Sequence, residues 1–111
     1  MKAQLEVCWR NIKKRKDVQK LIHDKITKLE QVCSDITSYR IVVEKPQKHQ
    51  ESGRIFQVRL DICVPPGNDL VVKKDAGKGE MDEDLEFVIH RAFDTARRQL
   101  KKIVKKQRER S

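Results

Sequence analysis

The residues best placed to do chemistry in this sequence are lysines and arginines, and the chemistry they favour is the binding of phosphate groups. Between positions 97 and 110, eight cationic side chains stand against Glu109 alone. Between positions 10 and 28, eight more stand against Asp17 and Asp24. Like charges four residues apart destabilise an isolated helix, and a polyanion laid against them turns that repulsion into attraction. The two basic runs therefore predict a nucleic-acid-binding surface.

Twelve cations form the predicted RNA-binding set. Lys25 needs separate treatment, because it falls inside the apolar stripe of a predicted helix. It is either a lysine whose stem lies on the core with its ammonium at the rim, or a residue in a groove between two helices that points at RNA, and both can hold. The alternative for the basic run from 97 to 110 is a solvated helix face or a tail that frays from about residue 106. The twelve residues are Lys13, Lys14, Arg15, Lys20, Lys25, Lys28, Arg91, Arg98, Lys101, Lys102, Lys105 and Lys106.

Other chemistries lack the residue patterns that they need. His23, His49 and His90 have no spacing to cysteines or carboxylates that is typical of a metal site. The acidic cluster from Glu80 to Glu86 is better explained as negative charge at the start of a helix. The sequence contains no Walker loop and no nucleophile motif. We therefore expect no enzyme activity, no catalytic residues, no metal, no cofactor and no small-molecule substrate.

Composition limits the class of protein. A chain of 111 residues suffices for one domain, and the excess of 26 Lys and Arg over 17 Asp and Glu gives a net charge of +9. That excess favours a nucleic acid or an anionic membrane as partner. No segment approaches the roughly 20 apolar residues of a membrane span, and the N-terminus lacks the apolar run of a signal peptide. We expect a single cytoplasmic domain over residues 1–111, with free thiols at Cys8, Cys33 and Cys63.

The elements that must position these cations follow from the hydrophobic pattern. Apolar residues that alternate along the chain predict strands at residues 2–10, 36–45, 54–64 and 69–74. Apolar residues at helical spacing predict helices at 17–33 and 82–110. A polar stretch at 47–53 predicts a hairpin loop, and Pro65-Pro66-Gly67-Asn68 predicts a tight turn. The order of elements is β-α-β-β-β-α.

This order predicts a two-layer α+β sandwich with a four-stranded mixed sheet. A strand, a helix and a strand in sequence imply a crossover, so the first two strands should be parallel neighbours, and the others should follow as antiparallel hairpins. Each strand has one strongly apolar side, so both helices should cover the same face of the sheet and form one continuous cationic surface. Trp9 and Tyr39 have core parity. With few exposed aromatics, binding should depend on phosphates and shape rather than on base stacking.

The sequence resembles the ribosome hibernation-promoting factors, also called ribosome-associated inhibitors. The resemblance spans nearly the whole chain and is carried by VRLDICVPPGNDLVVKK, by DLEFVIHRAFDTARRQLKK and by the order of elements. It implies a fold akin to double-stranded RNA-binding domains. It also implies binding in the small ribosomal subunit between head and body, over the mRNA channel and the aminoacyl and peptidyl tRNA sites, which keeps idle ribosomes inactive and protected.

The resemblance also assigns residues. It implies basic contacts at Lys25 and Lys28 in the first helix and at Arg98, Lys102 and Lys106 in the last. Two positions depart from the family: Leu85-Glu86-Phe87 displaces an aromatic residue, and Thr95 stands where a lysine is common. Because the chain stops just past the last helix, it would be a short-form member without the C-terminal domain that pairs ribosomes.

The leading hypothesis is a non-enzymatic factor that inhibits translation in stressed or stationary-phase cells. Its partners would be the small ribosomal subunit and ribosomal RNA, and it would be a monomer off the ribosome. The first alternative is a general double-stranded RNA-binding or RNA-chaperone module. The second, less favoured because no plausible catalytic group is present, is a small hydrolase of RNA or of peptidyl-tRNA.

Overall fold

The computed structural model describes residues 3–45, 56–75 and 85–110 and has the predicted order of elements. The predicted loop at 47–53, His49 and the acidic residues before position 85 lie outside the described residues. Within them, the observed elements begin or end one to three residues from the predicted bounds. They are β1 (Gln4–Arg10), α1 (Lys16–Val32), β2 (Ser38–Glu44), β3 (Gln57–Cys63), β4 (Leu70–Asp75) and α2 (Leu85–Arg110).

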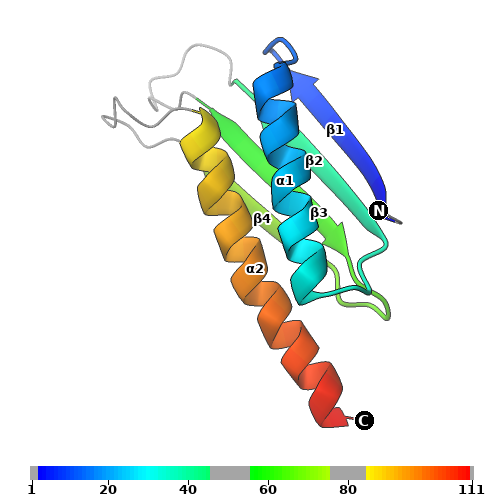
Figure 1. Cartoon of the computed structure of the whole chain (residues 1–111). Coiled ribbons are helices and arrows are strands. Elements are labelled where there is room, and N and C mark those ends of the chain that lie inside the picture. Colours follow the sequence, from blue (N-terminus) through cyan, green and yellow to red (C-terminus); the bar gives the residue numbers. More distant parts are fainter. Residues whose placement is uncertain (1–2, 46–55, 76–84, 111) are drawn as a thin grey trace.

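The four strands form one mixed sheet in the order β1-β2-β3-β4. β1 runs parallel to β2, with Val7 opposite Ile41, and this confirms the predicted crossover pairing. β2 and β3 are antiparallel, as are β3 and β4, where Leu60 lies opposite Val72. Both helices cover the same face of the sheet (Figure 1), so the predicted two-layer fold is confirmed.

The first three strands are shorter than predicted, because apolar residues of the connections continue the strand pattern. Ile36 and Val64 are buried, as their apolar character predicts, but they lie in the segments that lead into and out of strands. Asn11 adopts a left-handed backbone with φ of 58° directly after β1, a conformation that asparagine tolerates better than most residues. Gly67 has φ of 70° in the turn between β3 and β4, where a side chain would be strained.

The core lies between the sheet and the two helices. Ile22 and Ile26 of α1, Leu60 of β3, and Ile89 and Leu100 of α2 are all fully buried in it. Each such side chain contributes about 1.5–3 kcal/mol through burial. Trp9 packs against this core from the edge strand β1 but is only partly buried. Val88 is also fully buried, because α2 packs against both the sheet and α1 and so buries a wide arc of its surface.

The last helix is longer than the layer that it covers. At 1.5 Å per residue, its 26 residues span roughly 39 Å, whereas a seven-residue strand spans roughly 23 Å. The C-terminal part of α2 therefore projects beyond the end of α1 (Figure 1). Ile103 and Val104, at the start of this projection, are only half-buried. The structure is helical through Arg110, and fraying from about residue 106 remains a prediction.

Candidate nucleic-acid interface

The predicted RNA-binding residues lie on α1, on the segment before it and on α2. Nine of the twelve are exposed, and Arg15, Lys25 and Arg91 are half-buried. Within the described part of the chain, none of the nine lysines in the set forms an ion pair. Since a lysine ammonium has donors and no acceptor, these side chains can donate to an anion without first breaking an ion pair.

Arg15 differs from the lysines because a carboxylate lies next to it. Its Nη2 atom donates a hydrogen bond of 2.8 Å to Oδ2 of Asp17, in the first turn of α1. This hydrogen bond lowers the pKa of the Asp17 carboxyl below its ordinary value. Asp17 therefore stays ionised at neutral pH and offsets the charge of Arg15.

Arg91 is held where α2 begins. Its guanidinium carbon lies 5.8 Å from the centre of the Phe87 ring, one turn earlier, and its Nη1 atom lies 3.5 Å from the backbone carbonyl oxygen of Asp75 at the end of β4. Cation–π contacts at this distance are weakly attractive. Phe87 is itself 48% exposed, so this contact lies at the surface. The arrangement gives Arg91 a role in fixing the start of α2 beside β4.

The cations of α2 lie on two flanks of the helix. Arg91 and Arg98 line a shallow pocket together with Lys74 of β4. Lys101 and Lys105 line a groove with Val32, on the side of α1. The cationic surface therefore curves around the exposed side of α2.

Lys25 lies in the groove between the helices. It is seven residues, or nearly two full turns, before Val32, so the two side chains project from the same flank of α1. Val32 borders α2, whereas Gln19 and His23 line a pocket with β1 on the opposite flank. Lys25 is half-buried there. This position agrees with a stem on the core and an ammonium at the rim, and a contact between Lys25 and RNA stays a prediction.

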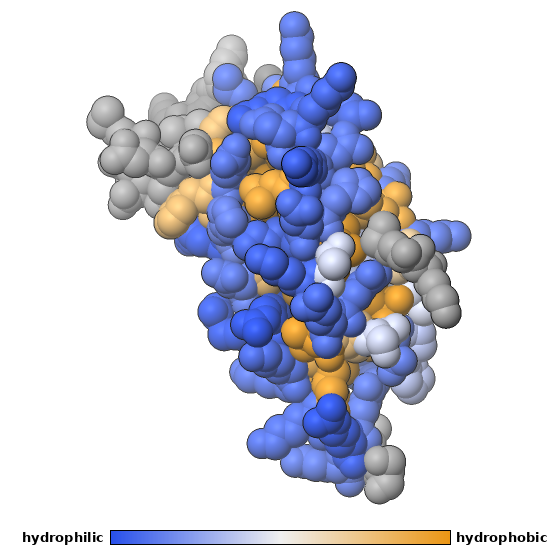
Figure 2. All heavy atoms as spheres, in the orientation of Figure 1, coloured by the Kyte–Doolittle hydropathy of each residue, from blue (hydrophilic) through white to orange (hydrophobic). Residues whose placement is uncertain are grey.

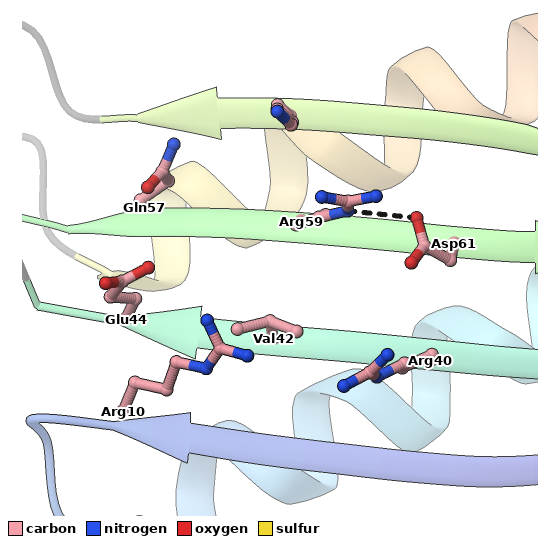
Figure 3. Close-up of a pocket in the computed structure, with 8 residues that line it drawn as sticks. Arg10, Arg40, Val42, Glu44, Gln57, Arg59 and Asp61 are labelled. Atoms are coloured by element: carbon pink, nitrogen blue, oxygen red, sulfur yellow. Dashed lines mark hydrogen bonds and ion pairs between the residues drawn. The ribbon is translucent and has the colours of Figure 1, made fainter.

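The opposite, open face of the sheet carries its own charged pocket (Figure 3). Two ion pairs lie on this face. Arg59 Nε lies 3.1 Å from Asp61 Oδ1, and Arg40 Nε lies 3.8 Å from Glu6 Oε1. Val42, buried on this face, separates the arginines. Here positive and negative side chains are interleaved, whereas on α2 nine cations stand against three carboxylates. The pocket is lined by Arg10, Arg40, Val42, Glu44, Gln57, Arg59, Asp61 and Lys73.

Lys74 and Arg108 were omitted from the predicted set but lie among its members. Lys74 borders Arg91 and Arg98, and Arg108 borders Lys101 and Lys105. Strand parity could have identified Lys74, because it shares the side of Leu70 and Val72 that faces α2. Arg108 belongs to the basic run, and its place follows from the seven-residue spacing to Lys101.

Other kinds of site find little support in the described residues. Residues 3–45, 56–75 and 85–110 contain no group of three or more His, Cys, Asp or Glu side chains that could hold a metal ion. Cys33 is buried, and Cys8 and Cys63 are partly exposed free thiols on the open face. Among the described helices, none is long and apolar enough to cross a membrane.

Comparisons with known proteins identify relatives of the whole chain. The model of the family described as "Sigma 54 modulation protein / S30EA ribosomal protein" matches residues 5–108. The Protein Y N-terminal domain of Thermus thermophilus is 18% identical, with a TM-score of 0.68 over 93% of this chain and 99% of that one. A ribosomal subunit interface protein from Coxiella burnetii is 11% identical, with a TM-score of 0.71 over 90% of this chain and 96% of that one. No curated protein matches the chain.

Proposed function

The chain belongs to the sigma 54 modulation protein / S30EA ribosomal protein family, a family of ribosome-associated proteins, and on that premise we propose that it binds the small ribosomal subunit. It does so through the cations of α1, of the segment before α1, and of α2. The observation that carries the proposal is the distribution of charge between the faces. The lysines of the helix face have no carboxylate partners in the described chain, whereas arginines of the open face pair with Asp61 and Glu6.

Binding of this kind depends on phosphates more than on bases. Lysine is a compact charge on a flexible stem and carries little directional information, and lysines make up nine of the twelve predicted contacts. Contacts to phosphate position a protein on RNA without reading its sequence. The sheet supports both helices along one face and so fixes the spacing of their cations. The surface is thus suited to one shape of folded ribosomal RNA.

Once bound, the domain acts by occupying space rather than by catalysis. It lies between head and body of the small subunit, over the mRNA channel and the aminoacyl and peptidyl tRNA sites. A rigid domain of this size, 50 Å in its longest dimension, excludes mRNA and tRNA from positions that it fills. Translation is thereby inhibited in idle ribosomes of stressed or stationary-phase cells. The protein acts in the cytoplasm and is a monomer when it is off the ribosome.

The test is cosedimentation with purified small ribosomal subunits. The variant Arg98→Ala, Lys102→Ala, Lys106→Ala removes three cations from α2, and we expect it to lose binding while keeping its circular dichroism spectrum. All three side chains are exposed, so the fold does not need them.

A matched control removes the same charge from the other face. The variant Arg40→Ala, Arg59→Ala, Lys73→Ala also lowers the net charge by three, and it should bind small subunits nearly as well as the unmodified protein. Equal loss in both variants would mean that binding follows net charge alone. Retained binding by the α2 variant would contradict the proposed surface.

The predominance of lysine also favours a second candidate function, which is general binding of double-stranded RNA. Lysines act as point charges and can contact any phosphate backbone. A competition assay separates the two functions. If the protein is a ribosome factor, assembled small subunits should displace it from a labelled RNA duplex. They should do so at a far lower mass concentration than the unlabelled duplex requires. Equal displacement by both competitors would favour the general module.

A further inference from the structure

A groove between the C-terminal ends of the two helices combines apolar side chains with three cations. Val32 of α1 and Val104 of α2 contribute the apolar part, and Lys101, Lys105 and Arg108 contribute the charged part. Figure 2 shows apolar surface in this lower region of the helix face, with hydrophilic side chains around it. The groove measures about 410 Å³. Small-ligand sites range from roughly 300 to 1,000 Å³, so the groove can hold one group of that size.

The charge in this groove is of one sign. None of its five lining residues is acidic, whereas Glu44 and Asp61 line the open-face pocket beside its arginines. A ligand that complements the groove therefore carries negative charge next to a flat or apolar part. An unpaired nucleotide of RNA has this combination, because its phosphate is anionic and its base has an apolar face. A paired nucleotide lacks it, because its base is stacked inside the duplex.

We propose that this groove holds one unpaired nucleotide of the bound RNA. The base packs against Val32 and Val104, and the phosphate lies between Lys101 and Lys105. The inference rests on the proposed function and makes it more specific, since it adds recognition of a splayed base to contacts with phosphates. The exposed position supports it: Val32 and Val104 are only half-buried, and α2 projects past α1 at this point.

The geometry of α2 supplies a matched pair of variants. Lys101 and Lys105 line the groove, whereas Lys102 and Lys106 do not, and all four are exposed lysines on the same two turns of the helix. The variants Lys101→Ala, Lys105→Ala and Lys102→Ala, Lys106→Ala thus change net charge equally. They differ in which side of α2 loses its cations.

The experiment measures binding to three RNA duplexes of about 16 base pairs, a length that a compact RNA-binding domain can span. One duplex is fully paired, one has a single unpaired uridine in the middle, and one has an abasic site in place of that uridine. The unmodified protein should bind the duplex with the unpaired uridine about tenfold more tightly than either of the others, because only an unpaired base buries its apolar face against the two valines. Equal affinity for all three RNAs would overturn the inference.

The variants then locate the preference. Lys101→Ala, Lys105→Ala should reduce the tenfold ratio to near one. Lys102→Ala, Lys106→Ala should weaken binding to all three RNAs and leave the ratio unchanged. The nearly isosteric Val32→Thr, Val104→Thr should reduce the ratio without changing affinity for the paired duplex, because it keeps every charge. If the ratio stayed near tenfold in all three variants, the preference would lie outside the groove.

The outcomes keep this inference separate from the proposed function. If the protein cosediments with small subunits but binds all three RNAs alike, the ribosomal function stands and the nucleotide subsite is wrong. If it prefers the unpaired uridine but does not bind small subunits, the ribosomal function is wrong and the groove is a subsite for another RNA. If an acidic peptide displaces the protein from RNA and the three RNAs bind alike, the groove is a peptide site and the inference fails.

Discussion

The open face of the sheet and the helix face both carry many charged side chains. Cations and carboxylates balance on the open face, whereas cations predominate on α2. Across the open face, strand register places Arg10 opposite Glu44 and Arg40 opposite Asp61. Arg59 lies opposite Lys73, and Asp61 supplies the partner for Arg59 from two residues along β3. Apart from Lys74, which faces α2, the four strands hold four cations and four carboxylates. On α2 alone, nine cations stand against three carboxylates.

This difference shows that the net charge of +9 is concentrated rather than spread evenly. Opposite charges on neighbouring strands attract one another, so the open face attracts a polyanion little. Like charges along the exposed side of a helix repel one another, so an anion that binds to the helix face lowers this repulsion. Net charge alone would have predicted a basic protein, and the partnering of the charges indicates which face is basic.

The largest expected effect that distinguishes the faces is on the salt dependence of binding. If about six phosphates are contacted, affinity for small subunits should fall about a thousandfold between 50 and 200 mM salt, by analogy with duplex DNA. Filter binding at several salt concentrations gives the slope of log affinity against log salt. Removing Lys102 alone should make this slope shallower by about one unit, while removing Lys73 alone should leave it unchanged. A shallower slope in both variants would erase the distinction between the faces.

A comparison of two neighbouring residues tests which face of the sheet holds the core. Leu60 is fully buried under the helices, and Leu60→Ala should lower the free energy of unfolding by about 2–5 kcal/mol because it leaves a cavity. Arg59 projects from the opposite face beside Asp61, and Arg59→Ala should lower it by less than about 1 kcal/mol, since exposed ion pairs contribute little. Urea denaturation measures both. Similar losses would mean that the open face is packed as tightly as the core.

One carboxylate can be removed from each face, and only the substitution on the helix face should change binding to small subunits. Asp17→Asn takes the carboxylate from Arg15, so we expect roughly two- to fivefold tighter binding to small subunits, the gain from about one additional phosphate contact. Asp61→Asn makes the same charge change beside Arg59 and should alter binding by less than about twofold. Equal gains in the two variants would show that Arg15 has no special place in the interface.

The lowered pKa of Asp17 gives this contact a pH dependence. A carboxyl whose pKa is lower in the folded than in the unfolded state stabilises the fold above its unfolded pKa, and the effect is lost as pH falls through the folded pKa. At neutral pH Asp17 is therefore fully ionised in both states. The advantage of Asp17→Asn over the unmodified protein should persist between pH 6 and 8, and a change across that range would contradict the assignment.

The smallest expected effect concerns a polar atom on the core side of the sheet. The hydroxyl of Tyr39 is buried and has no hydrogen-bond partner among the described residues, and burial raises the pKa of this phenol. Tyr39→Phe removes the hydroxyl and keeps the ring, so the free energy of unfolding should stay the same or rise by up to about 1 kcal/mol. Tyr39→Ala, which also removes the ring, should instead lower it by about 3–5 kcal/mol. A clear loss of stability in Tyr39→Phe would mean that the hydroxyl is bonded.

Prediction succeeded where a repeating pattern along the chain decides the structure. Alternation in Val58, Leu60 and Ile62 identified the buried side of β3, and helical spacing in Ile22, Ile26 and Leu29 identified that of α1. Element bounds were less accurate, because Ile36 and Val64 continue the apolar pattern after the strand hydrogen bonding has ended. The twelve cations were identified as a class by their number in two runs, and their individual contacts with RNA remain predictions.

The sequence by itself determined the elements, their order, the side of each that is buried and the strong excess of positive charge on the helices. These properties follow from local periodicity and composition, which any stretch of chain carries without its neighbours. Only the tertiary structure decided that Lys74 lies beside Arg91 and Arg98, and that Val32 and Val104 share a groove with Lys101 and Lys105. These neighbours come from distant parts of the chain, and their meeting depends on strand register and on how the helices pack, which no local pattern specifies.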